Sequence, residues 1–448
     1  MRQRSRGRVT LAGVAAMCAV AALPGGTAWA AGEPNPYAFD TDAQTIEGAE
    51  STANAKALKD GTTYHSSIGP GGKLNYRVDL DAEKNAYVSV VAVPKLGTKF
   101  AYGDGIKVSL QNSQGSNCSS NHALAGSAAF ARPFAAYAYR TVERDGSSCQ
   151  KAGAYNVLVE RTGSATSTPE DWELEIRHVT EPALKDGGPT EAPSEWPSAS
   201  PALPGGGSKE RAGGTSFNDA AEISEGEWNS RMKAGRTYFY RVPVDWGQQI
   251  FATAAIGSGS GNDYVGNALN MQLYNPVRGF VTDGSTAYDG KQKEAALNPL
   301  PEVAYENRYD SSAKVNGMRF AGSYYLAVSL NPELGEKYGE EPFGVTLRLN
   351  VEGSAKAAPA YVGPLGDFGV SEGEKAEKSS TMKLVGAAGI GAGTVLVLGL
   401  GAWMLVARRR VAGQPHVLPA SAQGQAQAPI QPQSRPQSQS QYGPPAAW

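Results

Sequence analysis

The chain is poor in the side chains that many enzymes use for catalysis. Its 448 residues contain only 4 histidines and 3 cysteines. Nucleophilic catalysis needs a base, usually histidine, beside the nucleophile. The sequence has no Gly-x-Ser-x-Gly elbow, no His-x-x-x-His or Cys-x-x-Cys pair, and no phosphate-binding or dinucleotide-binding glycine motif. We therefore expect no enzyme and no cofactor, with one alternative left open: a wall hydrolase with an unrecognised carboxylate pair.

The chain also lacks a large excess of positive or negative charge. The chain has 41 lysines and arginines against 43 aspartates and glutamates, a formal net charge of −2. It therefore offers no basic footprint for nucleic acid, which we exclude as a partner. Phe (11) and Met (7) are scarce while Gly (54) is abundant, and no stretch of the region between the two ends has a convincing helical period. This composition predicts a turn-rich, all-β architecture.

The two ends predict the topology. Residues 1–30 have a basic start, an apolar run and a closing Ala28-Trp29-Ala30, which is typical of a secretory signal peptide. Leu384–Val406 is long and apolar enough to cross a bilayer as a helix. The arginines that follow it predict a cytoplasmic C-terminal side: Arg408, Arg409 and Arg410. We expect a single-pass cell-membrane protein with its N-terminal bulk extracellular.

Composition divides the rest of the chain into six segments. Two blocks alternate apolar and polar residues as half-buried strands do, and their neighbours are rich in Pro, Gly, Gln or charge. The predicted segments are a polar leader (31–45), β-sandwich 1 (46–182), a Pro/Gly-rich linker (183–212), β-sandwich 2 (213–352), a stalk (353–383) and, after the membrane helix (384–406), a disordered Gln/Pro-rich cytoplasmic tail (407–448).

The two blocks look like copies of each other. Leu74–Asp81 aligns with Tyr238–Asp245. Three more pairs follow in the same order: Tyr87–Ala92 with Phe251–Ile256, Gly153–Val159 with Gly322–Val328, and Trp172–Ile176 with Phe343–Leu347. Matching order and spacing predict a tandem duplication. Pro243 in the second copy predicts an edge or an interruption of its strand, because proline cannot donate to a ladder.

Only the first copy contains cysteine. Cys18 leaves with the predicted signal peptide, and Cys118 and Cys149 remain as an even pair in an oxidising compartment. We predict a disulfide between them; the alternative is two buried free thiols.

The paired strands resemble a known bacterial module. Gly235–Ile256, which reads Gly-x-Thr-Tyr-Phe-Tyr-Arg-Val-Pro-Val, a Gly-Gln-Gln turn and an apolar strand, is similar to the pre-peptidase C-terminal domain. The later Gly-x-Tyr-x-Leu-x-Val strand of that module is matched by Gly322–Val328 and more loosely by Gly153–Val159. The resemblance implies tandem jelly-roll-like β-sandwiches, a fold attached to many secreted bacterial enzymes, and implies no activity.

The whole chain also resembles membrane-anchored exterior proteins of streptomycete-type actinobacteria. The resemblance includes the tail ending Tyr-Gly-Pro-Pro-x-x-Trp and four internal segments: Asp245–Gln249, Leu273–Pro276, Tyr305–Tyr309 and Met318–Gly322. It implies topology and fold rather than a biochemical role.

Ligand candidates lie mainly in the second copy. Aromatic rings in its long connections are candidates for stacking on a sugar or a protein partner, with core packing as the alternative: Tyr274, Phe280, Tyr288, Tyr305 and Tyr309. Three loop carboxylates are candidates for a calcium site, with local turn chemistry as the alternative: Asp263, Asp283 and Asp289. Asp79, Asp81 and Asn85 form a further, partial ligand string, and we interpret His65, His122 and His178 as surface or strand-end residues.

The expected function is non-enzymatic binding or scaffolding at the cell surface. The partners we expect are the bilayer and either cell-wall glycan or another protein. Gly389 and Gly393 in the membrane helix form a Gly-x-x-x-Gly step, which suggests a homodimer, although glycine-rich spans are common. An accessory subunit of a membrane protease or secretion assembly is the alternative.

Overall fold

The fold is taken from a computed structural model that describes residues 37–142, 148–163, 169–185, 191–193, 195–199, 201–202, 204–365 and 368. No helix in these ranges is long and apolar enough to cross a membrane. The predicted signal peptide, membrane helix, arginine cluster and cytoplasmic tail lie outside the described residues.

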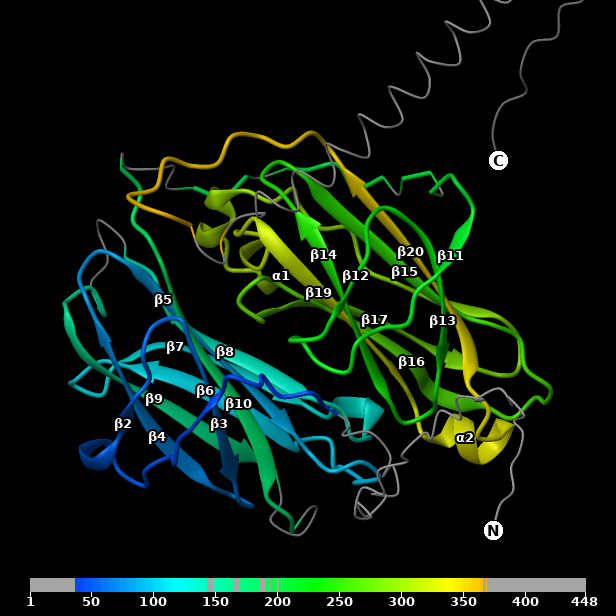
Figure 1. The fold of residues 1–448 in the computed structure, drawn as a ribbon, viewed down its shortest axis with the longest axis horizontal. Coiled ribbons are helices and arrows are strands. Elements are labelled where there is room, and N and C mark those ends of the chain that lie inside the picture. Colours follow the sequence, from blue (N-terminus) through cyan, green and yellow to red (C-terminus); the bar gives the residue numbers. More distant parts are fainter. Residues whose placement is uncertain are drawn as a thin grey trace, which may run out of the picture. The chain divides into compact units, whose positions relative to one another are not determined.

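The first sandwich consists of two five-stranded sheets (Figure 1). One has the order β1-β3-β10-β5-β8 and the other the order β2-β4-β9-β6-β7. The strands are β1 Gln44–Thr45, β2 Lys56–Ala57, β3 Thr62–Ile68, β4 Lys73–Leu80, β5 Asn85–Val93, β6 Gly105–Gln111, β7 Asn117–Leu124, β8 Phe134–Arg140, β9 Gly153–Thr162 and β10 Trp172–Glu181.

The second sandwich has the orders β11-β13-β20-β15-β18 and β12-β14-β19-β16-β17. Its strands are β11 Ser208–Glu210, β12 Ala221–Glu222, β13 Gly226–Met232, β14 Thr237–Val244, β15 Gln249–Ile256, β16 Val265–Tyr274, β17 Phe280–Tyr288, β18 Lys293–Ala296, β19 Gly322–Leu330 and β20 Phe343–Glu352. The short helices α1 (Ala313–Asn316) and α2 (Glu333–Tyr338) lie in its connections. The prediction of an all-β protein with two tandem β-sandwiches is confirmed.

Strand registers show that the sandwiches are copies. Adding ten to each strand number converts the first topology into the second. Leu74 pairs with Val159, and the aligned Tyr238 pairs with Val328. The other aligned segments repeat this agreement: Trp172↔Ile68 with Phe343↔Met232, and Ile176↔Val90 with Leu347↔Ala254. All four segment pairs aligned from sequence therefore occupy equivalent strands.

A buried tyrosine recurs at the same position of both cores. Tyr76 in β4 and Tyr240 in β14 are both 0% exposed. Burial raises the pKa of each phenol to about 12. The Tyr76 hydroxyl lies 2.9 Å from the Ser66 hydroxyl, a hydrogen bond that partly offsets this rise in the first copy. Pro243 lies three residues beyond, in a continuous β14, where the short neighbour β12 no longer pairs. The proline is therefore accommodated beyond the stretch of β14 that pairs with β12, and the strand is not interrupted.

Three segments that composition marks as peripheral pack against the sandwiches. Tyr37 of the predicted leader is 0% exposed, and β11 of the second sandwich lies inside the predicted linker. Tyr361 and Phe368 of the predicted stalk are 6% and 1% exposed. Each of these short polar stretches contains an apolar or strand-forming residue that packs against a sandwich. Local composition does not show which surface such a residue contacts.

Candidate functional site at the junction of the two sandwiches

The sandwiches meet through the outer faces of two sheets, which we call the junction. Strand β5 is buried at all nine positions, Asn85–Val93. Its even-numbered side chains, such as Val88 and Val90, belong to the core of sandwich 1. The odd-numbered Val91 and Val93 instead pack with Phe239 and Ala327 of sandwich 2. A strand covered on both faces is predominantly apolar, which explains the run Val90–Val93 in β5.

Strand β10 brings two carboxylates to the junction. Trp172, Leu174 and Ile176 alternate into the core of sandwich 1. Glu175 and Glu181 point to the opposite face, and both are 0% exposed because the second sandwich covers that face. Buried charges are expensive unless they are paired and hydrogen-bonded.

Glu181 is paired with an arginine of the second sandwich. Arg308 Nη2 lies 2.9 Å from Glu181 Oε1, and its Nη1 lies 3.1 Å from Oε2. Asn85 Nδ2 and the Tyr87 hydroxyl each donate to Oε2 at 2.8 Å, and the Tyr361 hydroxyl donates to Oε1 at 2.9 Å. Five donors from both sandwiches and the predicted stalk thus satisfy one carboxylate.

Glu175 forms a second such centre. Arg278 Nη1 donates to Oε1, and the Tyr37 hydroxyl donates to the same oxygen at 3.0 Å. Asn218 Nδ2 and the Asp40 amide donate to Oε2 at 2.8 and 2.9 Å. Arg278 has a φ of +60° in the turn between β16 and β17, a left-handed conformation that costs free energy and is held by these contacts.

The pKa directions agree with an ionised Glu181–Arg308 pair. Burial by itself raises the pKa of Glu181, but the Arg308 charge and the hydrogen bonds to the carboxylate hold it below its ordinary value. Burial lowers the pKa of Arg308, yet the nearby Glu181 charge raises it overall. Both groups are therefore charged at neutral pH.

A third arginine at the junction has no carboxylate. Arg319 is 0% exposed, and its guanidinium lies 4.4 Å from the Tyr139 ring centroid, 5.0 Å from Phe320 and 5.3 Å from Tyr87. Its Nη2 donates to the Tyr137 hydroxyl at 3.3 Å, while Nε and Nη1 have no partner among the described residues. Aromatic faces therefore supply most of the stabilisation of this charge.

A cavity of about 210 Å³ opens at another part of the junction. Sandwich 1 contributes His122, Arg132 and Phe134, and sandwich 2 contributes Gln272, Tyr274 and Phe280. Arg132 donates to the Ala125 carbonyl at 2.9 Å, so its charge is used within the protein. The free lining is aromatic with two polar side chains, His122 and Gln272, the usual composition of a small-ligand site.

The five aromatic residues predicted to contact a ligand lie in three different environments. Tyr274 and Phe280 line this cavity, with ring centroids 6.1 Å apart. Tyr288 is 0% exposed in the core of sandwich 2. Tyr305 and Tyr309 are half-buried, and the Arg308 guanidinium lies 3.3 Å from the Tyr305 ring centroid.

The predicted calcium ligands are dispersed. Asp289 pairs with Lys293 at 3.0 Å, while Asp263 and Asp283 are exposed. Asp81 caps a turn by accepting from the Glu83 and Lys84 amides. Within the described ranges, no group of three or more His, Cys, Asp or Glu side chains could hold a metal ion.

His65 and His178 make structural contacts, and the interpretation of His178 as a surface or strand-end residue was wrong, because it is buried within β10. His65 lies 2.8 Å from Glu173, and the exposed His122 borders the cavity. His178 is 2% exposed, and its Nδ1 lies 3.0 Å from the Leu58 carbonyl. Burial lowers the pKa of His178, so that the ring is neutral.

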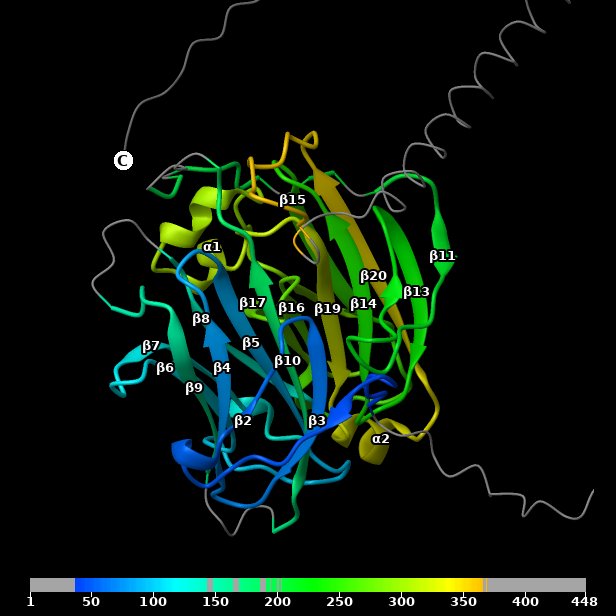
Figure 2. The ribbon, with the colours of Figure 1, turned by 60° about the vertical axis from the view of Figure 1, so that its left-hand side comes forward.

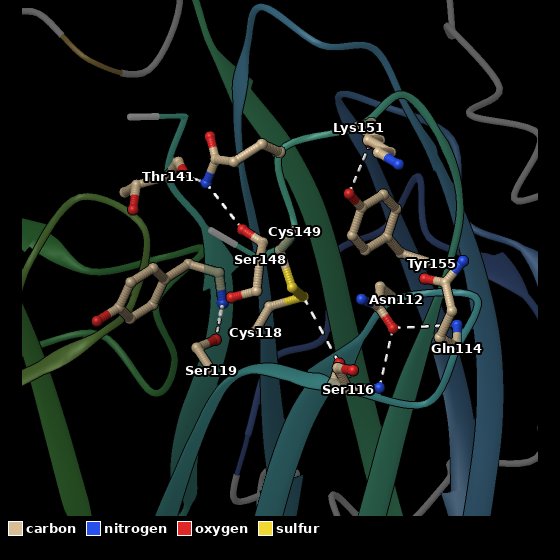
Figure 3. Close-up of a disulfide and its surroundings, with 12 residues drawn as sticks. Asn112, Gln114, Ser116, Cys118, Ser119, Thr141, Ser148, Cys149, Lys151 and Tyr155 are labelled. Carbon is tan, nitrogen blue, oxygen red and sulfur yellow. Dashed lines mark hydrogen bonds between the residues drawn. A yellow bond between two sulfur atoms is a disulfide. The ribbon is translucent and has the colours of Figure 1, made fainter. Parts of the chain in front are cut away.

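The structure contains the predicted disulfide (Figure 3). Cys118 lies in β7, and Cys149 lies in the connection from β8 to β9, with a Cα–Cα distance of 5.8 Å. Ser119 beside the bond accepts the Tyr139 amide at 2.6 Å, which links β7 to β8. The bond therefore fixes edge strand β7 of sandwich 1.

The ionic centres of the junction were not predicted from the sequence. Glu175 has the position of a solvent-facing residue in an alternating strand. One signal was present: the segments Tyr305–Tyr309 and Met318–Gly322, marked by the actinobacterial resemblance, contain Arg308 and Arg319. Asn307, in the first of these segments, donates to the Met318 carbonyl at 2.9 Å and joins the two segments.

Comparisons with known proteins give no family. No protein-family model and no curated protein match the chain. Among solved structures it is similar to a triple jelly-roll turret protein of an archaeal virus, at 8% identity and a TM-score of 0.18, over 64% of this chain and 53% of that one. It thus spans about half of that protein's length.

Two further similarities are of the same kind. The N-terminal tandem CBM22 domains of a Paenibacillus barcinonensis protein match at 10% identity and a TM-score of 0.18, over 66% of this chain and 93% of that one. An empty cowpea mosaic virus particle protein matches at 9% and 0.18, over 78% and 100%. TM-scores this low carry no argument about this chain.

Proposed function

We propose that this protein is a non-enzymatic, cell-surface binding or scaffold protein that presents two fused β-sandwiches on a membrane anchor. The observation that carries the proposal is the junction. Two buried Glu–Arg pairs and two apolar clusters join both copies into one compact body. A partner would therefore bind a surface to which both sandwiches contribute. The resemblance to the pre-peptidase C-terminal domain and to actinobacterial exterior proteins supports an exported location.

The junction cavity is the proposed contact point. Its volume, about 210 Å³, suits a single sugar ring or one side chain rather than a larger ligand. Phe280 offers a half-exposed ring, and Gln272 offers an amide that also accepts the Tyr274 hydroxyl at 3.1 Å. We propose cell-wall glycan or a surface protein as the partner, and a homodimer through the membrane helix as a further assembly.

Removing the cavity ring tests this proposal. Full-length protein in detergent is incubated with isolated cell walls and with membrane extract, and bound protein is quantified. Phe280→Ala is expected to weaken retention about tenfold, since a central aromatic contact is commonly worth more than 1 kcal/mol. Trp228→Ala is the matched control, because this half-buried ring lies on β13, which is not part of the cavity lining.

The outcomes separate the alternatives. Retention that Phe280→Ala leaves unchanged would remove the cavity from the proposal. A stoichiometric membrane partner recovered from the extract would favour an accessory subunit. Turnover of wall glycan that one Asp or Glu substitution abolishes would favour a hydrolase.

The proposed orientation has its own test. Protease added to intact protoplasts is expected to digest the sandwiches and leave a membrane-bound fragment with the tail, because the arginine cluster predicts a cytoplasmic C-terminus. Immunoblots against an N-terminal and a C-terminal tag report both ends. Loss of the C-terminal tag alone would reverse the topology.

A further inference from the structure

Two tyrosines are the most exposed of the large apolar side chains of the described residues. Tyr102 is 73% and Tyr264 is 68% exposed, whereas Val362 is 57% and Leu96 is 37% exposed. A single exposed ring is normal on a soluble protein. This pair differs from a chance exposure because the two tyrosines occupy equivalent places in the duplicated fold.

The two rings occupy equivalent loops. Tyr102 lies in the loop from β5 to β6, and Tyr264 lies in the loop from β15 to β16. These four strands occupy the same places in the two copies. Each sandwich thus presents one ring shortly before the same strand: Tyr264 directly precedes β16, and two residues separate Tyr102 from β6.

The β5–β6 loop and the start of strand β16 both contact one short turn at the junction, Gly126–Ala128. The Gly126 amide donates to the Tyr102 carbonyl at 3.0 Å. Asn267, three residues after Tyr264, donates to the Ser127 carbonyl at 3.2 Å. The summed chain and hydrogen-bond lengths along the path from Tyr102 through the turn and Asn267 to Tyr264 give an upper limit of about 30 Å for the distance between the two tyrosine Cα atoms. Figure 2 shows this end of both sandwiches beside α2.

The backbone under each ring is held in place. Asp104, 1% exposed, accepts the Ala101 amide at 2.7 Å beside Tyr102. The Tyr264 carbonyl accepts Lys337 Nζ of α2 at 2.8 Å. Loops that are ordered before binding lose little conformational entropy when a ligand arrives.

We propose that Tyr102 and Tyr264 form a two-point platform for a polysaccharide chain. An exposed ring can stack on the apolar face of a sugar, and two rings on ordered backbone suit a ligand whose units repeat. Protein partners instead favour a contiguous apolar core with a polar rim. The exposed sequence neighbours of these rings are small or polar: Ala101 and Gly103 beside Tyr102, and Asn262 and Asp263 beside Tyr264. This proposal rests on the wall-facing location in the proposed function.

The test uses full-length protein in detergent and protease-treated cell walls, with and without extraction of the attached polysaccharides. Tyr102→Ala and Tyr264→Ala are each expected to weaken binding about tenfold, and the double variant about a hundredfold. Tyr102→Phe and Tyr264→Phe should bind as the parent does, since the stacking face remains. Val362→Ala is the exposed control, and unchanged melting temperatures confirm folding.

Wall binding that the double alanine variant retains would overturn the platform and leave the proposed function standing. A wild-type protein that binds neither wall preparation would overturn the platform, and failure to bind membrane partners as well would overturn the proposed function. Loss of a protein partner, rather than of wall polysaccharide, in the double variant would replace the polysaccharide with a protein ligand. Persistence of binding after extraction identifies the wall backbone as the polysaccharide.

Discussion

Glu181→Ala is expected to lower the free energy of unfolding by about 3–5 kcal/mol. The substitution leaves the Arg308 guanidinium, which is 3% exposed, without its counter-charge. It also removes the acceptor of Asn85, Tyr87 and Tyr361. Urea denaturation followed by tryptophan fluorescence measures the loss. A change below about 1 kcal/mol would show that water enters the junction and that the sandwiches are not held together by this pair.

A double variant and a pH series identify the cause. Removing both charges with Glu181→Leu and Arg308→Leu should cost less than the sum of the single changes, because no buried charge is left unpaired. The native pKa of Glu181 is below its unfolded value, so its contribution is complete above about pH 4.3 and is lost as the pH falls through the native pKa. Glu181→Gln should flatten this acid-side loss, and an unchanged pH profile would assign the acid sensitivity to other groups.

Replacing Cys118 and Cys149 together by serine is expected to cost about 3–4 kcal/mol. The bond joins residues with a sequence separation of 31. Without it the unfolded chain regains the conformational entropy that loop closure removes, and the expected cost is the free energy of that entropy. The melting temperature of sandwich 1 should fall by about 10 °C. Glu181→Ala should act on the junction instead, so the two losses should add within about 0.5 kcal/mol.

Mass spectrometry checks the bond directly. Alkylation without reductant should add no label to the exported protein, and alkylation after reduction should add two. Two labels without reductant would show free thiols, and the serine variant would then report only on packing around Cys149, which is 8% exposed.

The sequence alone was sufficient for the repeat and its strands. Alternation at Leu74, Tyr76 and Val78 placed β4, and the matching segment placed β14 in the same register. Local patterns carry this information because the period of a strand and the turn residues beside it are properties of neighbours in the chain. The cysteine pair was likewise predictable, since only one pairing remained once Cys18 was assigned to the signal peptide.

Local pattern could not identify the junction. Glu175 and Glu181 alternate with core residues, as solvent-facing glutamates do, and their partners Arg278 and Arg308 lie 103 and 127 residues away. Alternation specifies which face a side chain is on and says nothing of what covers that face. The same limit applies to Tyr274. Its place in the sequence predicted a contact for the ring but could not distinguish a ligand from a protein side chain, and in the structure the Phe217 ring lies 5.2 Å away.

The amino-acid sequence by itself thus determined two copies of one β-sandwich and the cysteine pair of the first, because these depend on short-range order. Only the tertiary structure decided that the outer sheet faces meet and that two glutamates become buried counter-ions. It also placed one exposed tyrosine per copy at the edge of the junction. Burial on the second face of a sheet is set by a partner distant in sequence, and nothing in the strand itself encodes that partner.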